Sequence, residues 1–135
     1  MQQPSTPAQT QVHTLLLVAD RDVETAESLA QHSPHLYETI GFHCQQAAEK
    51  YLKAALAVHG LPTPFIHDLT SLATSLATQV AFDFDDVSAA TILTAFAVKW
   101  RYERDDAPDF TVPELLAMMR RFQTKLRPLA VAFLP

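Results

Sequence analysis

Apolar residues along this chain recur at spacings of three and four, which places them on one face of an α-helix. Within residues 8–32 the apolar positions of this kind are Leu16, Ala19, Val23, Ala26 and Ala30. Acidic residues occupy the opposite face of the same segment. The first part of the chain is therefore predicted to form one long amphipathic helix.

Prolines and helix-capping residues divide the middle of the chain. A second helix is predicted from about Leu36 to His59, because Gly60 and the LPTP segment after it are typical of a helix end. Asp68 precedes the apolar run LTSLATSLA, and an aspartate in this place commonly caps a helix N-terminus. We therefore expect a short third helix after Asp68.

Two further helices are predicted in the C-terminal part of the chain. Asp85 or Asp86 can cap a fourth helix that reaches to about Arg104. A fifth helix is predicted from about Pro113 to Leu126. Basic residues near the end of this last helix suit the negative end of its dipole.

Together these patterns predict an all-α fold, an antiparallel up-and-down helical bundle of four long helices plus one short helix. We expect a single domain over residues 1–135, with a core of about 12–127. The N-terminal residues 1–8 and the C-terminal tail 128–135 are expected to be peripheral. VAFLP at the end is expected to dock as a tail rather than form a strand.

Composition narrows the class of protein. The net charge of -5 disfavours a protein that coats nucleic acid through bulk positive potential. No apolar run approaches the ~20 residues that span a membrane, and the N-terminal residues lack the pattern of a secretory signal. Cys44 is the single cysteine, so no internal disulfide can form, and a reducing cytoplasm is the expected location.

Polar residues form a narrow stripe on the second predicted helix, which is otherwise mostly apolar. In QQAAEKYLKAAL (45–56), Gln46, Glu49, Lys50 and Lys53 fall within about 100° of one another on a standard helix. Such a stripe can face solvent, with a Glu49–Lys53 pair worth only about 0.2–0.5 kcal/mol. It can also face a groove or a partner chain.

The segment around this stripe resembles the core signature of HEPN domains. FHCQQAAEKYLKAALAVHGLPTPFIHDLTSLA (42–73) is similar to the family's Gln-Ala-Ala-Glu-Lys-x-x-Lys-Ala helix and to the Thr/Ile-His-Asp-Leu helix start that follows it. VADRDVETAESL (18–29) is similar to the family's first helix, and WRYERDD (100–106) lies where the family carries an Arg-Tyr pair. The resemblance covers roughly residues 12–127, nearly the whole chain.

The resemblance implies an antiparallel helical bundle, commonly a homodimer, that is often encoded beside or fused to a minimal nucleotidyltransferase. Some family members are metal-independent ribonucleases that carry an Arg, four to six intervening residues and then a His. Others lack that motif and are regarded as nucleotide- or substrate-binding partners of nucleotidyltransferases, or as toxin–antitoxin components.

The nuclease motif is incomplete in this chain. Arg101 matches the family's arginine, but Asp106, Ala107 and Pro108 occupy the positions where the histidine is expected. A histidine titrates near neutral pH without assistance, and no histidine follows His67. Asp106 would need a large upward pKa shift to replace it. Arg101 and Asp106 are catalytic candidates only if the chain is a nuclease.

Two interpretations of the polar stripe remain open. In the first, the stripe is structural, with Glu49 or Asp20 paired to Arg101, because buried charges persist only when they are paired. In the second, Lys50, Lys53 and Arg101 converge on a groove and hold a phosphate. The ligand-binding candidates are Gln46, Glu49, Lys50, Lys53, Arg101 and His67.

Other polar motifs have simpler explanations. His32 and His35 flank a proline between helices and lack neighbouring ligands, so no metal is expected, and no cofactor motif is present. His67 is expected to bond nearby backbone beside the capping Asp68. FDFDD (82–86) is expected to cap a helix rather than bind calcium, because it lacks the glycine and the closing glutamate of a calcium loop.

The sequence favours a non-catalytic nucleotide- or substrate-binding partner of a minimal nucleotidyltransferase, acting as a homodimer. One alternative is a ribonuclease-type toxin component of a toxin–antitoxin pair, for which RNA would be the substrate. Another is a homodimeric interaction module without a ligand, with its polar stripe buried between subunits. A membrane is not among the expected partners.

Overall fold

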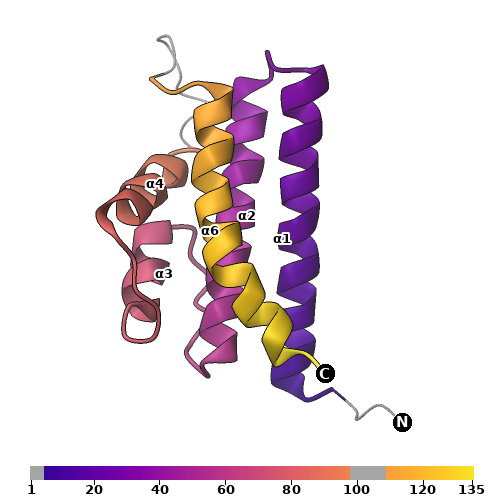
Figure 1. Ribbon diagram of the computed structural model, residues 1–135, viewed down its shortest axis with the longest axis vertical. Coiled ribbons are helices and arrows are strands. Elements are labelled where there is room, and N and C mark those ends of the chain that lie inside the picture. The colour runs from indigo at the N-terminus through magenta and orange to yellow at the C-terminus, as the bar shows by residue number, and fades with distance from the viewer. Residues whose placement is uncertain (1–4, 98–108) are drawn as a thin grey trace.

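The computed structural model describes residues 5–97 and 109–135, which form helices joined by short loops (Figure 1). The helices are α1 (Pro7–His32), α2 (Tyr37–Val58), α3 (Leu69–Leu76), α4 (Phe84–Thr94) and α6 (Val112–Phe133). No strand occurs in the part of the chain that is described. None of the described helices is long and apolar enough to cross a membrane. The all-α class is confirmed, and so are the first three predicted helices.

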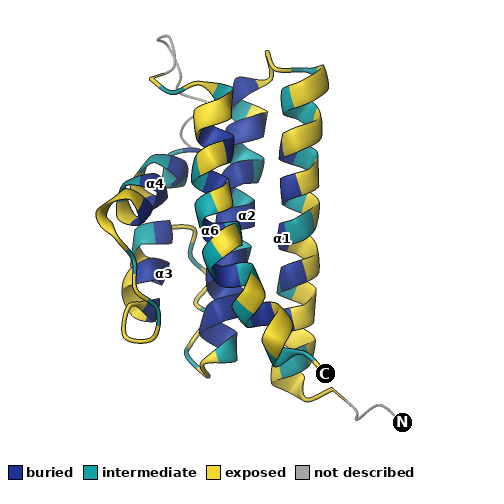
Figure 2. Ribbon diagram, in the orientation of Figure 1, coloured by how far each residue is buried: buried dark blue, intermediate teal, exposed yellow. Residues whose placement is uncertain are grey.

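Helix α2 is the centre of the bundle. It lies beside α1 and α6, and α1 runs antiparallel to both, while α3 and α4 pack on the opposite side from α1 (Figure 1). α2 touches each of the other four described helices and is buried along most of its length (Figure 2). Small buried residues on α2, among them Ala47, Ala48, Ala54 and Ala55, let the neighbouring helices approach closely.

Capping side chains fix the start of the helices. A capping box at Thr6 begins α1, and Asp68 caps α3 as predicted. α4 is capped by Asp83 and not by Asp85 or Asp86, which corrects the sequence prediction. Asp86 is the third residue of the helix, and its carboxylate accepts a hydrogen bond from the Asp83 backbone N–H at 3.0 Å. The FDFDD motif is thus a helix start, as expected, but with its first aspartate as the cap.

Helix α4 ends at Thr94, whereas the sequence predicted a helix that reaches to about Arg104. The last part of that prediction falls within residues 98–108, which lie outside the described residues. Arg101 and Asp106, the two conditional nuclease residues, belong to this range.

Helix α6 extends beyond its predicted end at Leu126 and runs through Pro128 to Phe133. The expected peripheral tail is therefore mostly helix, which corrects the assignment of VAFLP as a docked tail. Proline lacks an amide hydrogen and bends a helix, and α6 bends over its last turns (Figure 1). Burial of Ala130, together with a 3.2 Å hydrogen bond from Gln9 Nε2 to the Phe133 carbonyl, holds this end against α1.

The core contains a close approach between α2 and the residues after α4. A Cβ atom at Gly41 would lie 2.1 Å from Cδ1 of Phe96, so a larger residue would displace that buried ring. Cys44 is also fully buried, and this burial raises the pKa of its thiol to about 12. The thiol therefore stays protonated and packs as a small apolar group.

Candidate functional site

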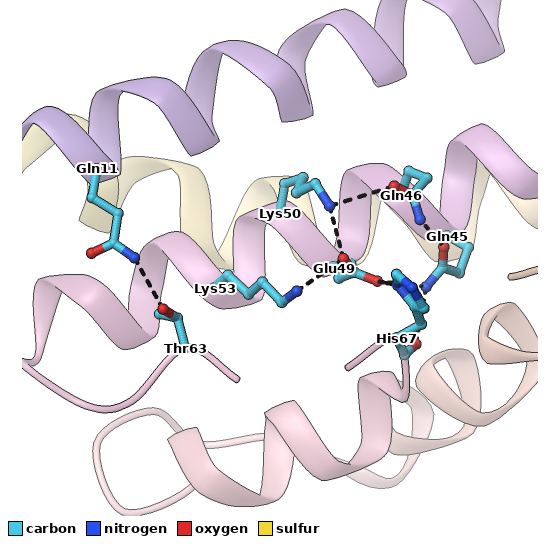
Figure 3. A network of polar contacts seen from close by, with 8 residues as sticks. All are labelled: Gln11, Gln45, Gln46, Glu49, Lys50, Lys53, Thr63 and His67. Carbon is cyan, nitrogen blue, oxygen red and sulfur yellow. Dashed lines mark hydrogen bonds and ion pairs between the residues drawn. The ribbon is translucent and has the colours of Figure 1, made fainter. Parts of the chain in front are cut away.

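Glu49 lies at the centre of the polar stripe on α2, and its side chain is fully buried. An ionised carboxylate in such a place is costly unless hydrogen-bond donors surround it. Four side-chain donors do so, from α2 itself and from the loop at residues 59–68 between α2 and α3 (Figure 3). The stripe therefore faces inward and is organised around one acid.

Each carboxylate oxygen of Glu49 accepts two hydrogen bonds. Oε2 accepts from Lys50 Nζ at 2.8 Å and from Lys53 Nζ at 3.1 Å. Oε1 accepts from His67 Nδ1 at 2.7 Å and from Gln45 Nε2 at 3.2 Å. The predicted Glu49–Lys53 pair is confirmed. We name these five residues the Glu49 cluster.

The cluster keeps Glu49 ionised. Burial opposes ionisation of the carboxyl, but hydrogen bonds from Lys50, His67 and Gln45, with the positive charge of Lys50, outweigh it and lower the pKa of Glu49 to about 2. An ionised carboxylate only accepts hydrogen bonds, so Nδ1 of His67 carries a hydrogen. This hydrogen bond orients the ring, with Nε2 at its other edge.

Positive charge exceeds negative charge in the Glu49 cluster. Lys50 and Lys53 each carry one positive charge, and Glu49 supplies the only negative charge among the five residues. The cluster is not sealed from solvent, because the side chains of Lys50 and His67 are 20% and 48% exposed. The two lysines thus exceed the one carboxylate of the cluster by one positive charge, near the surface of a chain whose net charge is negative.

Sequence reasoning chose Gln46 for the site and missed Gln45. Gln45 is fully buried and donates both to Glu49 and to the backbone carbonyl of His67, at 3.0 Å. Gln46 lies one step further out, where its Nε2 donates to Gln45 Oε1 at 2.7 Å and its Oε1 accepts from Lys50 at 3.4 Å. Position 45 lies four residues before Glu49, the same spacing that identified Lys53, and this was the available signal.

The role of His67 differs from the sequence prediction. Its ring was expected to bond nearby backbone, but it reaches across to Glu49, 18 positions earlier in the chain. The structure thus brings Gln46, Glu49, Lys50, Lys53 and His67 together in one network. Arg101, the remaining predicted ligand residue, lies outside the described residues.

Asp20, the other acid considered as a partner for Arg101, is not part of the Glu49 cluster and pairs with other residues. Arg127 Nη2 donates to Asp20 Oδ2 at 2.9 Å, and the Tyr51 hydroxyl donates to Asp20 Oδ1 at 2.6 Å. Burial opposes ionisation of Asp20, yet these two partners lower the pKa of its carboxyl. Asp20 therefore ties α1 to α2 and α6.

A second buried carboxylate, Asp86, joins α4 to α6. Arg121 Nε donates to its Oδ1 at 3.0 Å, and Lys125 Nζ donates to its Oδ2. Arg121 also donates to Asp83, with Nη2 3.0 Å from Oδ1. We name these four residues the Asp86 clamp. Within residues 5–97 and 109–135, no group of His, Cys, Asp and Glu side chains is arranged to hold a metal ion.

The family model for the HEPN domain matches residues 12–126, most of the chain. The chain therefore belongs to the HEPN family. This range contains α2, the loop after it and the whole Glu49 cluster. The family assigned from the sequence motif is therefore confirmed.

Two solved structures share the fold. One is the crystal structure of TT1696 from Thermus thermophilus, with 22% sequence identity and a TM-score of 0.71, covering 92% of this chain and 98% of that one. The other is ST0689, described as an archaeal HEPN homologue, with 23% identity and a TM-score of 0.65, covering 90% of this chain and 97% of that one. No curated protein matches the chain. At these identities the likeness establishes the fold alone.

Proposed function

We propose that this HEPN domain is a non-catalytic nucleotide- or substrate-binding partner of a minimal nucleotidyltransferase. The observation that carries the proposal is the charge surplus of the Glu49 cluster, in which two lysines share one buried carboxylate. Membership of the HEPN family supports the class of partner. We further propose that the protein acts in the cytoplasm as a homodimer.

The geometry suits a phosphate group. Glu49 holds the ammonium groups of Lys50 and Lys53 within 3.1 Å of one oxygen, so the two cations are positioned before a ligand arrives. Each ammonium has three donors, and the bond to Glu49 uses one of them. A phosphate has several acceptor oxygens and a negative charge that the surplus cation can balance. His67 adds a partly exposed ring at the edge of the same site.

The arrangement gives Glu49 an organising role rather than a chemical one. Its pKa of about 2 keeps it ionised at neutral pH, so it has no proton to give and its oxygens are already occupied by donors. A general acid or base needs a pKa near the working pH. Binding, rather than proton transfer, is therefore the chemistry that this part of the site supports.

A thermal-shift measurement with ATP tests the proposal. A ligand that binds only the folded protein stabilises it by about 2.7 kcal/mol at a concentration of 100 Kd, so Tm should rise by several degrees. In Lys50→Ala the rise should disappear, with each variant compared against its own ligand-free Tm. Arg120→Ala is the matched control, because Arg120 is a half-exposed cation on α6 paired only loosely with Glu27, at 3.4 Å.

Three outcomes separate the candidate functions. A rise in Tm that is lost in Lys50→Ala and kept in Arg120→Ala supports the binding module. Cleavage of short RNA in the same samples would favour the ribonuclease-type toxin component. Absence of both a shift and cleavage would leave the interaction module, with the Glu49 cluster as part of the architecture.

A further inference from the structure

Phe65 is the most exposed large apolar residue of the described chain. It lies in the loop between α2 and α3, and 92% of its surface is open to solvent. Single exposed apolar residues are common on protein surfaces and need no special explanation. A binding role of Phe65 therefore depends on its neighbours and not on its exposure.

The Phe65 ring lies near two members of the Glu49 cluster, Lys53 and His67. Lys53 Nζ is 5.7 Å from the centre of the ring, within the range of a cation–π interaction. The His67 ring meets it edge-on, with centroids 6.0 Å apart and planes at 62°. Lys53 thus lies between the Glu49 carboxylate and the aromatic ring, and the same ammonium serves both.

The loop that carries Phe65 is held in place on both sides. Gln11 of α1 donates from Nε2 to the Thr63 hydroxyl at 3.0 Å, and the His67 carbonyl accepts from Gln45 at 3.0 Å (Figure 3). Pro64, directly before Phe65, has a fixed φ. An aromatic ring on a restrained loop loses little conformational freedom on binding, which favours a recognition role.

We propose that Phe65 is the base-stacking platform of the nucleotide site, with the phosphates held by Lys50, Lys53 and His67. This inference rests on the proposed function and adds to it the part of the ligand that gives selectivity. A base can stack on the exposed ring while the phosphates reach the surplus positive charge beside it. Purine nucleotides should bind more tightly than pyrimidine nucleotides, because the larger base covers more of the ring. Free phosphate chains should gain nothing from Phe65.

Isothermal titration calorimetry with ATP and with inorganic tripolyphosphate tests this inference. In Phe65→Ala the Kd for ATP should rise about 10-fold, as expected for the loss of one base–aromatic stack. The Kd for tripolyphosphate should stay within about 2-fold of the wild-type value, because that ligand has no base. Phe65→Trp should retain ATP binding. Phe84→Ala is the matched control, because Phe84 is 84% exposed and lies at the start of α4, on another element.

The outcomes distinguish this inference from the proposed function. If the wild-type protein binds neither ligand, both proposals are overturned. If it binds ATP and Phe65→Ala binds ATP equally well, the stacking role is overturned while the anion site stands. If Phe65→Ala weakens both ligands to the same degree, Phe65 acts by positioning Lys53 and not by stacking, which also overturns the inference. Loss confined to ATP supports it.

Discussion

Two buried carboxylates of the described residues, Glu49 and Asp86, are partnered in different ways. Glu49 is 0% exposed and Asp86 is 3% exposed, and in both the donors overcome burial and lower the pKa of the carboxyl. Around Asp86, the charges of Arg121 and Lys125 are balanced by two carboxylates, those of Asp86 and Asp83. Around Glu49, two lysines face a single carboxylate.

The two clusters also differ in what they connect. The Asp86 clamp joins α4 to α6, because Asp86 is separated in the chain from Arg121 by 35 positions and from Lys125 by 39. Its charges cancel, as expected for an ion pair that stabilises helix packing. The Glu49 cluster lies within α2 and the loop after it, and its own residues include two lysines but only one carboxylate. The balanced charges of the Asp86 clamp fit a structural role, and the surplus charge of the Glu49 cluster is the basis of the proposed ligand site.

The largest effect is expected from Glu49→Gln. The substitution replaces one carboxylate oxygen of Glu49 with an amide NH₂ group, which would face the hydrogen-bond donors of the cluster. It also removes the negative charge that pairs with the nearly buried Lys53. Breaking a buried ion pair from one side costs about 3–5 kcal/mol, so Tm should fall by roughly 10–15 °C in calorimetry.

The matched control for this prediction is Glu24→Gln, the same chemical change at an exposed position of α1. It should change the free energy of unfolding by less than about 0.5 kcal/mol. Equal, small effects of the two substitutions would mean that the Glu49 cluster contributes no stability.

The contribution of Glu49 to stability should depend on pH. The pKa of Glu49 falls from an ordinary value of 4.5 to about 2 on folding, so its contribution is present above about pH 4.5 and is lost as the pH falls toward 2. That contribution is about 3 kcal/mol. Urea unfolding of wild type and Glu49→Gln should therefore give a stability difference that shrinks by this amount between pH 5.5 and pH 2. Parallel curves would contradict the lowered pKa.

A smaller effect is expected from Asp86→Asn. The side chains of Arg121 and Lys125 are 36% and 31% exposed, so water can solvate both once the charge is removed, and Arg121 keeps Asp83. We expect a loss of about 2 kcal/mol by chemical denaturation and no change in ATP binding. Loss of ATP binding in Asp86→Asn would contradict the proposal that the Asp86 clamp is structural and that the Glu49 cluster binds the ligand.

The smallest effect is expected from Arg120→Ala, which breaks a half-exposed ion pair. It should lower the free energy of unfolding by under about 0.5 kcal/mol, as measured by chemical denaturation.

Much of this architecture could be predicted from the sequence because it depends on local signals. Helical periodicity, the capping Asp68 and the helix-ending Gly60 each act over a few residues, and they placed α1, α2 and α3 correctly. The Glu49–Lys53 pair followed from i, i+4 spacing on one helix.

Two local signals were misread, the capping Asp83 and the i, i+4 position of Gln45, and the other errors arose where distant parts of the chain meet. α6 continues through Pro128 because burial of Leu126 and Ala130 outweighs the lost backbone hydrogen bond, which a local rule for proline does not include. The Asp86 clamp was missed because its cations lie far along the chain from Asp86.

The places of α1, α2 and α3, the family and most of the polar stripe followed from the sequence alone, since periodicity and spacing along one helix are local properties. The burial of Glu49, the hydrogen bond that it accepts from His67 and the approach of Lys53 to the Phe65 ring became visible only in the folded structure. The reason is that burial and the convergence of charges depend on packing between elements distant in sequence. These properties fix the pKa of Glu49 and the surplus charge of the site.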